Sequence, residues 1–151
     1  MIAPWPLLLL LVHAGATAAM AGLIAFVQWV HYPLFGRVGS DDYTAYANEH
    51  VRRTTPVVAP LMLTEMATAV VLLIQPPPGV SSTLPVIGLV LLAIIWLSTA
   101  ALQVPCHRRL EQGFDAQTHR RLVNTNQIRT VAWLLRTLVA AAMLIRYVSA
   151  V

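Results

Sequence analysis

The sequence predicts an all-α integral membrane protein: a four-helix up-down bundle in one domain, residues 1–151. The chain is 58% hydrophobic and only 11% charged, about half the charge of an average soluble domain. Its apolar residues fall into four blocks, each about long enough to cross a bilayer as a helix. All ten of its basic residues are arginines, and they gather at the ends of these blocks, as in multi-pass membrane proteins.

The first span is predicted at about residues 6–30. An early apolar run followed by small residues loosely resembles a signal peptide, but no basic residue precedes it, so we treat it as a retained helix. Small residues at Gly15, Ala18, Ala19 and Gly22 favour close packing against a neighbouring helix. Pro33 and the glycine that follows it are expected to break this helix.

A second helix is expected to begin near Ser40 or Asp41, either of which can cap it. Pro56 and Pro60 lie within it. The stripe of residues that shares one helix face before the prolines, from Tyr43 to Thr54, continues at helical spacing beyond them. We therefore expect a kink rather than an end, and a second span at about residues 57–74.

A third span is predicted at about residues 84–104, and Pro105 with the following residues 106–109 (CHRR) is expected to end its helix. Asp115 then caps a long fourth helix, because an aspartate there can accept a hydrogen bond from the first turn. The polar first half of this helix extends helix 4 out of the membrane, as residues 40–55 do for helix 2, and its span is about residues 130–148. Residues that are mostly polar or aromatic recur along it at helical spacing and are expected to share one face; they are His119, Leu122, Asn126, Arg129, Trp133 and Arg136.

The arginines also predict the orientation. The segments 31–56 and 105–129 hold eight of the ten arginines, whereas the N-terminal tail and the 75–83 connector hold none. The positive-inside rule places these two segments in the cytoplasm and both termini outside, in a bacterial inner membrane. Four arginines are expected to contact anionic lipid headgroups, and no nucleic-acid surface is predicted; they are Arg108, Arg109, Arg120 and Arg121.

Apart from Arg146, near the outer end of the fourth span, two charged residues lie inside the apolar spans: Glu65 and Arg136, both deep within them. At about 1.5 Å per residue, both lie about 10–12 Å below the cytoplasmic edge. Because either charge alone is costly in lipid, we predict that they form an ion pair. The pair either fixes the helix register or belongs to a catalytic site together with His50.

A cluster of polar side chains is predicted on the cytoplasmic side of that pair. Imidazoles can ligate a metal or haem or carry protons, but no diagnostic metal-binding spacing occurs, and hydrogen-bonded interfacial histidines are the other interpretation. The candidate metal ligands are His31, His50, His107 and His119. The candidate cofactor-binding residues are His31, His107, His119, Gln28, Gln103, Asn126 and Arg129, with Trp96 and Trp133 as apolar walls.

Several motifs resemble an uncharacterised family of small bacterial four-span membrane proteins. The matching segments are residues 28–35 (QWVHYPLF), 50–54 (HVRRT), 60–65, 103–110 (QVPCHRRL), 113–115 and 119–126. This family is more distantly similar to anthrone-oxygenase-like membrane proteins. The resemblance implies oxidation of a lipophilic small molecule, by analogy.

The leading prediction is a small membrane protein that binds a lipophilic molecule or a redox cofactor (haem, metal or quinone) near its cytoplasmic side, with oxidoreductase activity as one possibility. The alternative is a non-catalytic subunit or assembly factor, in a homo-oligomer or larger membrane complex, whose Glu65–Arg136 pair is structural. A transporter that uses Glu65 for coupling is a third option, although four spans are few for one.

Overall fold

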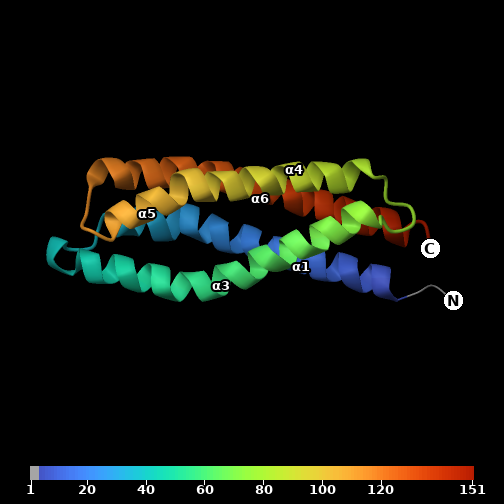
Figure 1. Ribbon diagram of the computed structural model, residues 1–151, viewed down its shortest axis with the longest axis horizontal. Coiled ribbons are helices and arrows are strands. Elements are labelled where there is room, and N and C mark those ends of the chain that lie inside the picture. Colours follow the sequence, from blue (N-terminus) through green and yellow to red (C-terminus); the bar gives the residue numbers. More distant parts are fainter. Residues whose placement is uncertain (1–3) are drawn as a thin grey trace.

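The computed structural model describes residues 4–151, and throughout that range the regular structure is helical (Figure 1). Four rods run alternately up and down, which confirms the predicted bundle, and residues 5 and 148 lie at the same end of it. Each rod is long and apolar enough to cross a membrane. The rods are α1 (Trp5–Phe26) with η1 (Val27–His31) and α2 (Tyr32–Phe35); α3 (Ser40–Ile74); α4 (Thr83–Ser98) with η2 (Thr99–Gln103) and α5 (Val104–Leu110); and α6 (Ala116–Val148).

The rods form a ring in which α6 packs extensively against α1 and α4, and α3 packs against α1. Contact between α3 and α4 is the least extensive of the four neighbouring pairs. The face of α6 predicted to be shared by polar and aromatic residues is indeed buried, from Leu122 to Arg136. The α3–α4 seam is thus the place where the bundle is most open.

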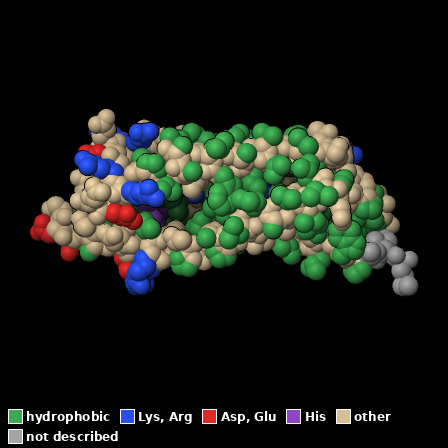
Figure 2. Space-filling view, in the orientation of Figure 1, with side chains coloured by type: hydrophobic (Ala, Val, Ile, Leu, Met, Phe, Trp, Pro, Cys, Tyr) green, Lys and Arg blue, Asp and Glu red, His purple; other side chains and the backbone are tan. Residues whose placement is uncertain are grey.

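The distribution of side chains is that of a membrane protein. Large apolar residues such as Leu97 and Leu138 are more than 60% exposed, while Glu65 and Arg136 are at most 1% exposed. Figure 2 shows hydrophobic side chains covering the flank and charged ones gathered at one end. Because lipid accepts apolar surface and rejects charge, this arrangement suits a bilayer.

Two prolines widen the helices that contain them instead of ending them. In η1 the amide of Tyr32 donates to the carbonyl of Val27, five residues back, and in η2 that of Val104 donates to the carbonyl of Thr99. Each donor directly precedes a proline, whose missing N–H and bulky ring disturb the normal helix, and a π-turn absorbs the disturbance. Neither Pro33 nor Pro105 itself ends a helix. The first rod ends at Phe35 with Gly36, the other predicted breaker, as its C-cap, and the third rod ends at Leu110, directly after the predicted terminating run of residues 105–109.

In α3, the predicted continuation through Pro56 and Pro60 is confirmed, since one helix spans Ser40–Ile74. Its N-cap is Gly39 rather than Ser40 or Asp41. In α6, Asp115 is the cap, as predicted, and its carboxylate accepts a 2.6 Å hydrogen bond from the Thr118 amide.

The small-residue face of α1 does not pack against a neighbouring helix as predicted. Gly15, Ala18, Ala19 and Gly22 are exposed, and a Cβ atom added at either glycine would meet nothing within 4 Å. The opposite, buried face of α1 carries polar residues, among them His13 and Thr17, which contribute to the interior of the bundle.

Candidate functional site

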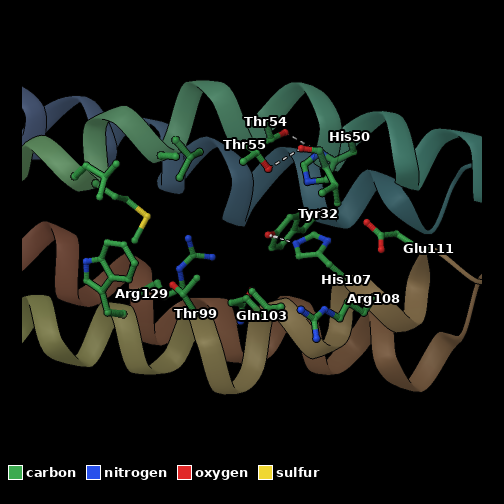
Figure 3. Close-up of a pocket in the computed structure, with 17 residues that line it drawn as sticks. Tyr32, His50, Thr54, Thr55, Thr99, Gln103, His107, Arg108, Glu111 and Arg129 are labelled. Atoms are coloured by element: carbon green, nitrogen blue, oxygen red, sulfur yellow. Dashed lines mark hydrogen bonds between the residues drawn. The ribbon is translucent and has the colours of Figure 1, made fainter.

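A cavity of about 650 Å³ opens at the seam between α3 and the α4–η2–α5 rod. Its volume is within the range of pockets that hold small organic ligands. In Figure 2 a hollow with a histidine inside it is visible where the apolar flank meets the charged end. The wall is mostly apolar, with Val58, Ala59, Met62, Leu63, Trp96 and Val104, and the polar side chains include Tyr32, His50, Thr54, Gln103, His107 and Arg129 (Figure 3).

Tyr32 and His107 form the first polar pair of the cavity. The Tyr32 hydroxyl lies 2.8 Å from His107 Nε2, and the two side chains meet between the helices in Figure 3. Tyr32 follows the π-turn η1 and His107 lies one turn beyond η2. The two proline-associated π-turns therefore flank the residues that build this pair, as π-turns often do at functional sites.

His31 and His50 form the second pair. Nε2 of His31 lies 2.8 Å from Nδ1 of His50, and the Thr54 hydroxyl is 3.2 Å from the same nitrogen. The rings of His50 and His107 stack, with centroids 5.3 Å apart. A hydrogen bond between two imidazoles requires one nitrogen to act as acceptor, so the pair carries at most one of the two positive charges.

His119 contacts the site through the backbone of Tyr32 and lies outside the cavity. Its Nε2 lies 2.7 Å from the carbonyl oxygen of Tyr32, and it is absent from the cavity lining. A Cβ atom at Gly36 would lie 3.2 Å from the His119 ring. The absence of a side chain at Gly36 thus gives this imidazole room to reach Tyr32.

A chain of hydrogen-bonded side-chain amides leads from η1 to the cavity. Gln28 Nε2 donates to the carbonyl of Val123, and Asn126 Nδ2 donates to Gln28 Oε1 at 2.9 Å. Arg129 Nη1 then donates to Asn126 Oδ1 at 3.2 Å. Gln28 and Asn126 do not line the cavity, so they position Arg129 rather than contact a ligand directly.

Glu65 and Arg136 form the predicted ion pair, with Arg136 Nε 3.4 Å from Glu65 Oε1. Trp133 Nε1 donates to the second carboxylate oxygen at 2.9 Å, and Arg136 Nη1 donates to the carbonyl of Gly88. The pair therefore joins α3, α4 and α6. Neither of its two residues, nor Trp133, lines the cavity.

The sequence did not predict the inner part of this network. His13 Nδ1 lies 2.8 Å from the Thr68 hydroxyl, and that hydroxyl lies within hydrogen-bond distance of the Thr64 carbonyl in the same helix. His13 is only 3% exposed. A histidine and a threonine 55 residues apart carry no shared motif, so only the packing of α1 against α3 reveals the contact.

The four candidate metal ligands do not form a metal site, although three of them lie together. The ring centroids of His31 and His50 are 4.8 Å apart, and those of His50 and His107 are 5.3 Å apart. His31 and His50 bond to one another, His107 to Tyr32, and His119 to a backbone carbonyl. Within residues 4–151 no three His, Cys, Asp or Glu side chains are arranged to hold a metal ion. These contacts agree with the other interpretation of the sequence, in which the histidines form hydrogen bonds.

The sequence did not predict Tyr32 as a site residue, although it lines the cavity. Its position between His31 and Pro33 was the available signal, because a proline-induced π-turn redirects the residues just before it. No sequence pattern distinguished the apolar residues of α3 that line the cavity, such as Ala59 and Met62, from the other apolar residues of that helix.

Comparison with protein-family models, curated proteins and solved structures finds no match to this chain.

Proposed function

We propose that this membrane protein binds a lipophilic small molecule in the cavity between α3 and the α4–η2–α5 rod. One observation carries the proposal: an apolar cavity that begins among Met62, Leu63 and Trp96 and reaches the polar side chains Tyr32 and His107. A ligand with a hydrophobic body and a polar group fits such a lining, which offers apolar area for affinity and a few polar atoms for orientation.

The polar end supports acid–base work on that ligand. Tyr32–His107 and His31–His50 are hydrogen-bonded pairs in which each partner can take or give a proton, as general acid–base chemistry requires. A quinone or a phenolic compound is a suitable ligand, since its oxygens change protonation on reduction or oxidation. An oxidoreductase role, as the family resemblance implies, would use the pairs in this way.

In this proposal the Glu65–Arg136 pair is structural. It lies outside the cavity lining and satisfies its charges among three helices. The same observation also favours the second candidate function, a non-catalytic subunit. The two functions differ in one respect, which is whether the cavity takes a ligand.

We propose that the charged end of the bundle faces the cytoplasm of a bacterial inner membrane. Arg108, Arg109, Arg120 and Arg121 are exposed there and form no ion pair within residues 4–151, so they are free to contact anionic lipid. Arg146 near the opposite end opposes this orientation. Fusing alkaline phosphatase, which is active only outside, to the C-terminus tests it: activity is expected, and an inactive fusion would reverse the orientation.

Trp96 provides a test of ligand binding, because quinones quench indole fluorescence and Trp96 lines the cavity. Decylubiquinone is titrated into the protein in mild detergent. We expect a saturable quenching component that the W96F variant lacks. W29F is the matched control, since Trp29 is 66% exposed and does not line the cavity, and it should keep that component.

Quenching that never saturates, or that is the same in W96F and W29F, would reflect quinone dissolved in the micelle. That result would overturn the binding proposal and favour the non-catalytic subunit.

A further inference from the structure

Arg129 is a buried cation that lacks a carboxylate partner. It is 6% exposed, and the ion pairs within residues 4–151 are formed by Arg52, Arg53 and Arg136 alone. Its Nη1 donates to the Asn126 amide oxygen, its guanidinium carbon lies 5.2 Å from the Trp133 ring centroid, and its Nε has no hydrogen-bond partner. These neutral contacts orient the guanidinium and leave its charge uncompensated.

This cation faces the cavity. Arg129 is one of the lining residues, and Figure 3 shows its guanidinium group projecting into the space between α3 and the α4–η2 rod. Within residues 4–151, six buried side-chain polar atoms have no hydrogen-bond partner, and three of them belong to the lining: Trp96 Nε1, Gln103 Oε1 and Arg129 Nε. Half of the unsatisfied buried polar atoms are thus found on residues around one cavity, two of them donors.

The other charges around the cavity do not neutralise Arg129. The lining contains one carboxylate, Glu111, on the residue that follows the end of α5 at the charged end of the bundle, and Arg108 lies nearby on α5. Neither Glu111 nor Glu65 lies within ion-pair distance of Arg129. The inner part of the cavity therefore carries net positive charge.

We infer that the ligand of this cavity is a lipophilic anion, whose oxyanion pairs with Arg129 while its hydrophobic body lies against Met62 and Leu63. The inference deepens the proposed function and rests on it. A carboxylate or phenolate matches the planar fork of a guanidinium and forms charge-assisted hydrogen bonds with it. Since a buried charge is costly until it is paired, an anion gains more at this site than a neutral molecule of the same shape.

The comparison with Arg136 supports this inference. Arg136 lies seven residues further along α6, is similarly buried, and is paired with Glu65. The bundle thus contains two buried arginines and one buried carboxylate. The missing second anion is the one that the ligand supplies.

The anion can come from two sources with the same chemistry: a free amphiphile such as a fatty acid, or the phosphate of an anionic membrane lipid, which no choline group neutralises. Two comparisons in phosphatidylcholine nanodiscs distinguish them. In the first, laurate and dodecanol, which share a chain length, compete with decylubiquinone for the Trp96 quenching site at alkaline pH. In the second, phosphatidylglycerol replaces part of the phosphatidylcholine.

We expect laurate to displace the quinone at a concentration about tenfold lower than dodecanol requires, because laurate can form a charge-assisted hydrogen bond. In R129Q that preference should disappear while dodecanol still competes, and in R129K part of it should remain. R37Q, which alters an exposed arginine outside the cavity lining, is the matched control and should keep the preference. If phosphatidylglycerol weakens quinone binding in the wild type but not in R129Q, the anion is the lipid phosphate.

Equal displacement by laurate and dodecanol in the wild-type protein would overturn the inference and leave the proposed function intact. That comparison needs no variant, so it stands even if R129Q does not fold. Absence of saturable quinone quenching would instead overturn the proposed function itself.

Discussion

Arg129 and Arg136 lie two turns apart on the buried face of α6, and only Arg136 is paired with a carboxylate. Trp133 lies between the two arginines along the helix. Its ring lies under the Arg129 guanidinium, and its Nε1 donates a hydrogen bond to Glu65, the partner of Arg136. One helix face therefore connects a closed ion pair in the membrane interior with an open cation at the cavity.

A double-mutant cycle tests the Glu65–Arg136 ion pair. Either E65Q or R136Q alone leaves an unpaired buried charge, which costs about 3–5 kcal/mol. The E65Q/R136Q double variant should lose clearly less than the sum, because two amides can hydrogen-bond to each other. Unfolding in mixed detergent micelles, followed by circular dichroism, measures the four free energies. Additive losses would mean that the two residues act independently.

The Tyr32–His107 pair is tested by Y32F. This change removes the hydroxyl that lies 2.8 Å from His107 Nε2 and leaves the ring in place. We expect the ¹⁵N chemical shift of that nitrogen to move, because a ring nitrogen that loses its partner changes tautomer or exchange behaviour. H119F is the comparison, since His119 bonds to the backbone of Tyr32. An unchanged ¹⁵N shift in Y32F would show that the two side chains do not interact.

Gly36 is expected to control the position of His119. In G36A the new methyl group would lie 3.2 Å from the imidazole, so the ring must move and its bond to the Tyr32 carbonyl weakens. We expect weaker quinone binding, by about threefold to tenfold for the loss of about one hydrogen bond. G22A, where a methyl group meets nothing within 4 Å, should bind as the wild type does. Equal affinities in both variants would separate His119 from the site.

The N-terminus of α6 is expected to loosen in acid. Hydrogen bonds from Thr118 hold the pKa of the Asp115 carboxyl below its ordinary value of 3.8. Since the folded pKa is the lower one, the stabilisation is present above the ordinary value and is lost as the pH falls through the lowered value. Hydrogen exchange of the Thr118 amide should therefore speed up at acid pH, after correction for intrinsic rates. In D115N, which does not titrate, this change should be absent.

The sequence could predict the parts of the fold that depend on local pattern. Hydropathy predicted the four rods, and helical spacing placed Asn126, Arg129 and Arg136 on one buried face. Equal depth in lipid was enough to pair Glu65 with Arg136, because few other partners for a charge exist at that level.

What the sequence could not predict depends on distant contacts. The cavity exists because α3 and α4 separate, which no local pattern encodes. Prolines normally signal a helix end, so the π-turns before Pro33 and Pro105, and with them the inward position of Tyr32, were missed. The small-residue face of α1 predicted a helix contact that this single chain does not make.

The central claim is that the cavity binds a lipophilic ligand, and two matched substitutions on α3 test it most directly. A59F places a ring in the cavity lining, whereas A67F places the same ring on the exposed face of the same helix. Saturable quenching of Trp96 by decylubiquinone is measured in both. We predict that A59F abolishes it and that A67F keeps the wild-type affinity. Equal saturable binding in the two variants would contradict the claim.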